Sequence, residues 1–300
     1  MDADKLINDY IDRTSPKMMV ILPLIVLLFS LGILAFHAYT SPENLPLKLG
    51  MEFTGGTVVT INTDETPQQL LNEFSDFPIV NVREAQEYGN RKLLQFSTMD
   101  DARQKRLNQI IDQKYSGADI KHVGEIFGRA LQQETVRLVL LSFLLMAIIV
   151  FVFFRTFVPS TAVILSAFSD IVFAAAMMDV VGMRLSMGTV AALLMLIGYS
   201  VDTDMLLTTR LLKRTGELKM KIREAMKTGL TMTLTTLAAL VVMFAVSTGA
   251  YIIVPSFSRI DIVSDISTVL IFGLIADILN TWMLNTGILR LYLERRGEKV

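Results

Sequence analysis

The sequence predicts a polytopic α-helical membrane protein with six transmembrane helices and a small α+β domain, of the ferredoxin-like kind, between the first two. Three observations predict this fold. The 300 residues are 52% hydrophobic and only 19% charged, with a mean hydropathy of +0.50, which is too apolar for an ordinary soluble domain. Six stretches are apolar over the roughly 20 residues that a helix needs to cross a bilayer. One long hydrophilic stretch, residues 40–133, separates the first apolar stretch from the other five.

The composition argues against several classes of function. The chain has no cysteine, so disulfides, thiolate metal sites and a cysteine nucleophile are excluded. It has no GxxxxGK[ST] motif, and we therefore expect no nucleotide hydrolysis. Its two histidines, His37 and His122, are far apart in the chain, and its net charge is -1. We expect no enzyme activity, no catalytic residue, no metal site, no cofactor and no nucleic-acid partner.

The six predicted spans divide the chain. The first lies within residues 18–39, and the others cover residues 136–154, 158–182, 185–209, 228–247 and 263–288. The first is predicted to be a retained anchor rather than a cleaved signal peptide, because its apolar run is long and no A-x-A site follows it. The predicted organisation is an N-terminal segment at 1–17, the first span at 18–39, the α+β domain at 40–133, the other five spans at 134–290 and a tail at 291–300.

Positive charge predicts the orientation in the membrane. Lysine and arginine gather before the first span, in the loop after the fourth and in the tail, at Lys5, Arg13, Lys17, Arg210, Lys213, Arg214, Lys219, Lys221, Arg223, Lys227, Arg290, Arg295, Arg296 and Lys299. Loops rich in these residues stay on the cytoplasmic side. We therefore expect a multi-pass protein of the cell membrane, with both termini in the cytoplasm and residues 40–133 outside.

The hydrophilic stretch reads as a β-α-β-β-α-β series, which is typical of a ferredoxin-like sandwich. Residues 55–63, 80–89, 92–98 and 118–124 favour strands, and residues 66–74 and 99–115 favour helices. A turn is expected around residues 89–91. We find no catalytic constellation here, and we interpret the surface charges as a solvated face.

Two glycine-containing motifs flank this domain. In "LGMEFTGGT", residues 49–57, Gly55 and Gly56 predict a tight turn into a strand. In "VGEIFGRALQQETVRLV", residues 123–139, Gly124 and Gly128 precede an amphipathic helix that leads into the second span.

Two carboxylates lie inside the fourth span. Asp202 and Asp204 occur in "LIGYSVDTDMLLTTRLLKR", residues 196–214, and a charge at the centre of a membrane helix costs about 2.5–3.5 kcal/mol on insertion scales. Because helical residues advance by about 100°, the two point roughly 200° apart and do not form a dyad. We expect one to face the helices of this chain and the other a partner bundle.

The neighbours of these carboxylates form stripes along the helices. Ser200, Asp204 and Thr208 align, and Asp202 aligns with Gly198, Tyr199 and Thr209. On the fifth span, Lys227, Thr231 and Thr235 align, and Lys227 is placed to reach toward one of the aspartates. Asp170 and Asp277 also lie within spans. Each of these carboxyls either couples ions or makes a structural polar contact between helices, and Ser166, Ser169 and Asn280 are nearby partners for Asp170 and Asp277.

Three motifs together resemble those of the SecF family of protein-export membrane proteins. "LGMEFTGGT" resembles G-x-D-F-x-G-G-T, and the matching residues are Gly50, Phe53, Gly55, Gly56 and Thr57, with Glu52 in place of the aspartate. "VGEIFGRAL" is similar to V-G-x-x-x-G-x-x-L, matched at Gly124 and Gly128. "IGYSVDTD" is similar to the fourth-span motif, matched at Gly198, Tyr199 and Ser200. The motifs occur in the right order over nearly the whole chain, and the D-T-D form and short loops resemble archaeal members.

The resemblance implies a function and partners. Members of the SecF family are similar to one half of the helical bundle of resistance-nodulation-division proteins. The resemblance implies that a SecD-like membrane subunit supplies the other half. The resemblance implies that the two subunits assist the Sec translocation channel in moving unfolded precursor proteins across the membrane, with membrane lipid around their helices. In bacteria, the two subunits use the ion-motive force for this work. The coupling ion would be H⁺ or Na⁺.

The sequence departs from the bacterial pattern at the coupling residues. The position of the functional bacterial aspartate is Thr203 here, and Asp202 matches the position where SecD carries its aspartate. Lys227 stands where the family usually has arginine. The candidates for ion coupling are therefore Asp202, Asp204, Lys227, Thr203, Asp170 and Asp277.

Two other functions stay open. The chain could be a small-molecule or lipid exporter of the same superfamily, although such exporters usually carry both halves in one chain. It could also be a scaffold of the translocon that transports no ion. Co-purification with a SecD-like chain would favour the export subunit, and substrate-specific efflux by this chain alone would favour the exporter.

Overall fold

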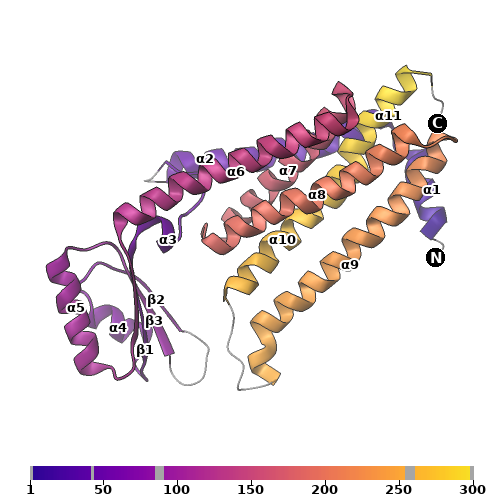
Figure 1. Cartoon of the computed structure of the whole chain (residues 1–300). Coiled ribbons are helices and arrows are strands. Elements are labelled where there is room, and N and C mark those ends of the chain that lie inside the picture. Colours follow the sequence, from indigo (N-terminus) through magenta and orange to yellow (C-terminus); the bar gives the residue numbers. More distant parts are fainter. Residues whose placement is uncertain (1–2, 42–43, 85–90, 254–260, 298–300) are drawn as a thin grey trace.

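The computed structural model describes residues 3–41, 44–84, 91–253 and 261–297. It consists of an elongated helical bundle and a small domain built on a sheet at one end of the bundle (Figure 1). The two termini lie together at the opposite end of the bundle. The turn predicted at residues 89–91 lies mostly outside the described residues.

Within the described residues, six helical segments are long and apolar enough to cross a membrane, which agrees with the predicted number of spans. The helices of the bundle are α2 (Pro16–Thr40), α6 (Glu125–Phe154), α7 (Phe157–Val181), α8 (Met187–Lys213), α9 (Leu218–Ile253), α10 (Asp261–Leu279), the π-helix η1 (Asn280–Asn285) and α11 (Thr286–Arg295). Several ends have local causes. A capping box between Ser186 and Thr189 begins α8, and Gly182, at φ 75°, ends α7.

Burial divides the bundle into central and outer helices. In the most apolar window of each span, 61% of residues are buried in α7, 50% in α8 and 44% in the α10–α11 span, against 22%, 11% and 17% in α2, α6 and α9. The three central spans therefore contain the places where a polar side chain can be kept from both lipid and water.

The small domain has the predicted β-α-β-β-α-β order. Its elements are β1 (Gly56–Asn62), α4 (Pro67–Glu73), β2 (Ile79–Glu84), β3 (Arg91–Phe96), α5 (Asp101–Lys114) and β4 (Asp119–Val123). The strands form one antiparallel sheet in the order β2-β3-β1-β4. The core of the domain lies between the sheet and the two helices, where Val59, Phe74, Phe96, Leu107 and Ile111 are fully buried.

The opposite face of the sheet is turned toward the bundle. Val58, Gln95 and Lys121 line a cavity of about 410 Å³ together with Arg184 and Asp265 of the bundle. This face of the sheet therefore lies next to the connection that precedes α8.

Two further helices lie in segments where the sequence analysis expected none. An amphipathic helix, α1 (Ala3–Arg13), buries Ile7 and Ile11 against Leu211, Ile222 and other apolar residues at the end of the bundle where the termini lie. The second, α3 (Met51–Thr54), occupies the first glycine motif ahead of the expected turn. Gly55 and Gly56 then make the turn at φ 77° and 135°, conformations that favour glycine.

Candidate functional site

Three aspartates from three different central helices lie in the interior of the bundle. They are Asp170 of α7, Asp204 of α8 and Asp277 of α10, and each is 0% exposed. Such residues inside a membrane protein are expensive to bury and are usually functional. The structure thus brings together three of the predicted ion-coupling candidates.

Asp170 has a donor on each carboxyl oxygen. Ser200 Oγ donates to Oδ2 over 2.5 Å, and Asn280 Nδ2 donates to Oδ1 over 2.7 Å. Both donors are buried. These contacts connect α7 to α8 and to the π-helix, so Asp170 also holds the central helices in register.

Asp204 is bound from the last span. Thr281 Oγ1 and Asn285 Nδ2 donate to its Oδ1 over 2.9 and 2.8 Å. Its Oδ2 has no hydrogen-bond partner among the described residues, although Ser166 of α7 lies near the carboxyl. This leaves one carboxyl oxygen able to take a proton or contact a small cation.

The hydroxyl of Thr281 lies between two of the carboxyls. Besides its contact with Asp204, Thr281 Oγ1 is 3.1 Å from Asp277 Oδ1. A threonine hydroxyl has one proton to donate. Both contacts are therefore hydrogen bonds only if one of the two carboxyls is protonated and donates to Thr281.

The π-helix places these donors. Its hydrogen bonds span five residues instead of four, so the helix is locally wider. Asn280, Thr281 and Asn285 are all buried toward the aspartates. The Trp282 carbonyl accepts a 2.9 Å hydrogen bond from the Tyr10 hydroxyl of α1. Gly229 of α9 makes room for the Trp282 ring, since a Cβ at this glycine would lie 2.4 Å from a ring carbon.

No lysine or arginine neutralises the three carboxyls within the described part of the chain. None of the three carboxyls forms an ion pair with a described residue. Each carboxyl faces hydroxyl groups, amide groups or another of the three carboxyls. An unpaired buried charge costs several kcal/mol even after relaxation. The site therefore favours states in which protons or a bound cation balance the carboxylates.

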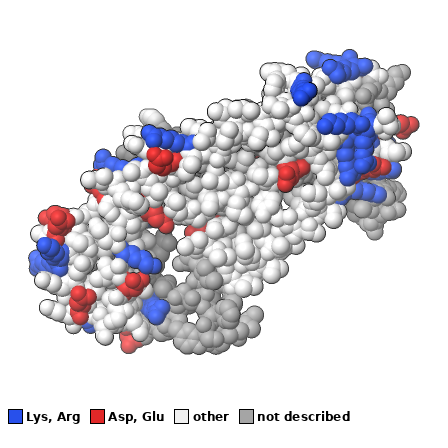
Figure 2. All heavy atoms as spheres, in the orientation of Figure 1, with Lys and Arg blue, Asp and Glu red and all other residues white. Residues whose placement is uncertain are grey.

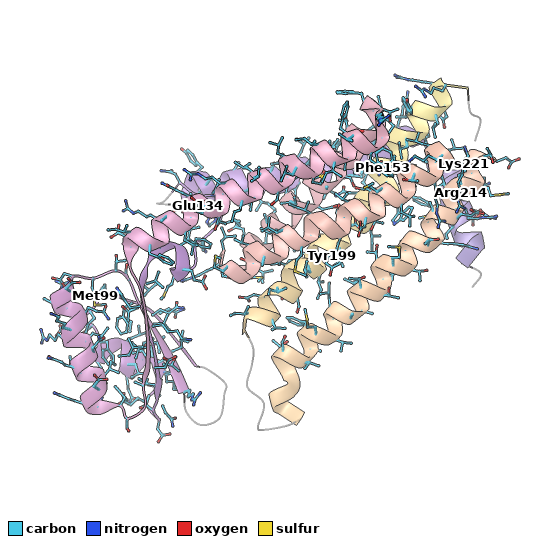
Figure 3. The ribbon with its side chains drawn as sticks, in the orientation of Figure 1. Met99, Glu134, Phe153, Tyr199, Arg214 and Lys221 are labelled. Carbon is cyan, nitrogen blue, oxygen red and sulfur yellow. The ribbon has the colours of Figure 1, made fainter. Side chains whose placement is uncertain are left out.

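The structure separates Asp202 from this site. Asp202 lies on the exposed side of α8 and makes no hydrogen bond or ion pair with another described residue. It lines a cavity of about 410 Å³ with Thr209, Arg210 and other residues of α8. Gly198 and Tyr199 share the exposed face, and Figure 3 shows Tyr199 on the side of α8 nearer α9.

Thr203 and Lys227 complete the predicted set. Thr203 is buried and donates to the Tyr199 carbonyl of its own helix. Lys227 lies on the exposed face of α9 and is not among the described groups that influence Asp170, Asp204 or Asp277. The expected approach of Lys227 to one of the aspartates stays a prediction.

Sequence reasoning did not single out Thr281 or Asn285. A signal was present, because "DILNTWMLNT" places Asp277, Asn280, Thr281 and Asn285 in an otherwise apolar span. Their spacing, i, i+3, i+4 and i+8, puts all four on one face of a helix, and in the structure the last three lie in the π-helix.

The two glycine motifs form a second assembly at the other end of α8. Phe53 is buried, and a Cβ at Gly128 of α6 would lie 2.8 Å from the Phe53 carbonyl oxygen. Thr57 is also buried and donates to Gln104 Oε1. Gly124 and Gly198, in contrast, have open space where a Cβ would lie.

Comparison with known proteins places the chain among export proteins. The family described as Protein export membrane protein SecD/SecF, C-terminal, matches residues 103–295, and the SecD/SecF GG Motif matches residues 44–67. The protein-export membrane protein SecF of Methanolacinia petrolearia is 48% identical over 288 residues, covering 96% of this chain and 98% of the relative. That of Methanocaldococcus jannaschii is 38% identical, covering 98% of this chain and all of the relative.

A solved structure shares the fold. The crystal structure of SecDF, a translocon-associated membrane protein from Thermus thermophilus, has a TM-score of 0.70 at 18% identity. The alignment covers 93% of this chain and 38% of that one. The family matches and the near full-length archaeal relatives show that the chain belongs to the SecD/SecF family of protein-export membrane proteins.

Proposed function

We propose that this chain is a SecF-type subunit of the protein-export machinery, and that ions passing through the site of Asp170, Asp204 and Asp277 couple the ion-motive force to precursor movement. The observation that carries the coupling is the burial of three carboxyls without a cation among the described residues. A site of this kind binds protons or a small cation in one state and must release or compensate them in another.

The hydrogen bonds of Thr281 suggest how loading changes the structure. With a proton on Asp277 or Asp204, Thr281 bridges the two carboxyls and holds α8 against the last span. When that proton leaves, two carboxylates face one hydroxyl proton, and one contact is lost. Repulsion between the charges then favours separation of α8 from α10 and the π-helix.

The charge distribution supports the proposed orientation. Figure 2 shows lysine and arginine gathered at the end of the bundle where the termini lie, and a belt almost without charge along its middle. We place this basic end in the cytoplasm. The antiparallel βαββαβ domain at residues 40–133 is then a ferredoxin-like domain on the outer side of the cell membrane.

The partner is a SecD-like membrane subunit. The exposed faces of α8 and α9 carry Tyr199, Asp202, Lys227, Thr231 and Thr235, which are too polar for lipid but suit contact with another bundle. The chain covers 38% of the SecDF chain, which leaves room there for a second set of spans. With that partner, the chain would serve the Sec translocation channel and its unfolded precursors.

Release of a secreted precursor from spheroplasts tests the coupling. Asp204→Asn, Asp170→Asn and Asp277→Asn should each slow release, and dissipating the H⁺ or Na⁺ gradient should add little further loss. Asp112→Asn is the control, because it makes the same chemical change at an exposed carboxylate of the small domain. Normal release by all three buried variants at wild-type membrane levels would contradict ion coupling. A loss confined to complex stability would favour the scaffold, and efflux of a small molecule by this chain alone would favour the exporter.

A further inference from the structure

The first glycine motif is hydrogen-bonded to the segment that begins α8. Gly50 N–H donates to the Leu185 carbonyl, and Leu185 N–H donates to the Lys48 carbonyl, both over 2.7 Å. These bonds form a parallel bridge between Leu49 and Leu185. Two segments that are far apart in the sequence are thereby joined where the outer domain meets the bundle.

Glu52 adds a side-chain contact to this joint. Its Oε2 accepts a 3.3 Å hydrogen bond from the N–H of Met187, the first residue of α8. The first N–H groups of a helix have no partner within the helix, and a carboxylate there also interacts favourably with the helix dipole. Ser186 caps Thr189 N–H at the same end, so Glu52 satisfies a donor that the capping box leaves open.

The other side of α3 is seated on α6. Gly128 lets the Phe53 carbonyl approach, and a Cβ at Gly55 would lie 3.0 Å from the Glu125 Cα. Gly56 then enters β1, which pairs with both β3 and β4. The short helix therefore lies between a central strand of the outer domain and the first turns of two membrane helices.

The helix held by Glu52 also carries the carboxyl site. Met187 and Asp204 are both in α8, and a helical rise of 1.5 Å per residue puts them about 26 Å apart along one axis. A regular helix transmits a tilt or shift over this distance because its backbone hydrogen bonds are continuous. A movement of α8 at Asp204 therefore also moves Met187 and Leu185, together with the residues that are hydrogen-bonded to them.

We infer that Glu52 and the Leu49–Leu185 bridge form a clasp that transmits movement of α8 to the outer domain, with Glu52 as a positioning residue of protein export. The inference rests on the proposed function, because it assumes that the state of the carboxyl site moves α8. The clasp is a fixed link: it stays closed while α8 and the domain move together.

Precursor release from spheroplasts at matched membrane levels tests the clasp. Glu52→Ala should slow release about two- to fivefold, the range expected for loss of a carboxylate at a helix N-terminus. Glu52→Asp should retain release, because it keeps the charge at this position. The chain has no native cysteine, so a disulfide in the variant L49C/L185C can replace the lost contact. Oxidation of E52A/L49C/L185C should restore release, and reduction should remove the rescue.

A glycine pair gives an independent arm. Gly128→Ala should slow release, because its Cβ would meet the Phe53 carbonyl oxygen at 2.8 Å, whereas Gly124→Ala meets nothing within 4 Å and should have no effect. Slow release by Asp204→Asn with normal release by Glu52→Ala would overturn the clasp and leave ion coupling standing. A disulfide that blocks release would also overturn it, because the link would then have to open. Normal release by Asp204→Asn would instead reject the proposed function.

Discussion

Asn285 donates a 2.8 Å hydrogen bond to Asp204 across 81 residues of sequence. The amide comes from a π-helix in the last span, and the carboxyl comes from the fourth-span motif. Asp204 therefore belongs to a family motif, whereas its partner Asn285 lies outside all three motifs. The bond makes the state of Asp204 depend on the packing of the last span.

Removing this amide should destabilise the bundle. Asn285→Ala leaves a buried acceptor with one donor fewer, and an unsatisfied buried polar group costs about 1–3 kcal/mol. Thermal unfolding of the purified chain in detergent measures the change. Thr208→Val is the control, because Asn285 contacts Thr208 only at 3.4 Å and Asp204 keeps both donors. Equal melting temperatures for the two variants would show that the Asn285 bond contributes little.

The contact between Gly229 and Trp282 should not tolerate a methyl group. Gly229→Ala would place a Cβ 2.4 Å from the indole ring, and overpacking of this kind typically costs about 1–3 kcal/mol. Gly249→Ala on the same helix meets no described atom within 4 Å and should be neutral or stabilising, because alanine is the better helix former. The same unfolding measurement compares the two. If Gly229→Ala were as stable as Gly249→Ala, the ring would have to move freely, and it would not fix the π-helix.

The hydroxyl of Tyr10 should support the π-helix from the N-terminal helix. Tyr10→Phe removes the donor to the Trp282 carbonyl, a loss of about 0.5–1.5 kcal/mol for a typical hydrogen bond. Hydrogen exchange of the amides in residues 280–286 should rise in this variant. Tyr292→Phe is the control, because Tyr292 makes no hydrogen bond to the π-helix among the described residues. Unchanged exchange in Tyr10→Phe would contradict this role.

The same tyrosine predicts a pH dependence at the alkaline end. Burial raises the pKa of Tyr10 to about 12, and the charge of Arg290 lowers it by a smaller amount. A pKa that is raised in the folded state means that folding favours the protonated hydroxyl. Its contribution to stability is complete below about pH 10 and is lost as the pH rises through about 12. The alkaline stability difference between wild type and Tyr10→Phe should shrink over this interval, as measured by unfolding at several pH values.

A charge cluster should stabilise the small domain modestly. Lys114 Nζ donates to Glu65 over 3.0 Å and to Glu73 over 2.6 Å. The hydrogen bond from Lys114 is the main cause that lowers the pKa of Glu65. Because the cluster is partly exposed, Lys114→Met should cost only about 0.2–1 kcal/mol, measured as faster amide exchange in β1. Lys105→Met, on the same helix, is the control.

The lowered pKa of Glu65 means that this stabilisation is present above its unfolded pKa of about 4.5 and is lost as the pH falls through the folded value. A Lys114→Met effect that did not shrink in acid would contradict the assignment.

Much of the candidate site could be predicted from the sequence. Asp170, Asp204 and Asp277 are conspicuous because each interrupts an apolar span. Helical geometry also predicts that Asp202 and Asp204 point in different directions. Which of them points inward could not be predicted, because both faces of that span contain apolar residues. Asp204 is buried against Thr281 and Asn285 of the last span, which donate to it.

The small domain was predictable because alternating strands, a capping sequence and turn residues agree with one another. The helix α3 was not, since four residues are too few for a periodic pattern. Its stability comes from contacts with Gly128 and Met187, which are distant in the sequence.

The sequence by itself determined the number of spans and the order of elements in the small domain. Apolar length and local periodicity decide these features, since lipid admits only segments that satisfy their own backbone hydrogen bonds. The tertiary structure alone decided which aspartates share a site, which face of α8 stays open and how the glycine motif joins α8. Those outcomes depend on how each helix is rotated about its own axis. Packing between residues such as Gly229 and Trp282, which no local pattern connects, sets that rotation.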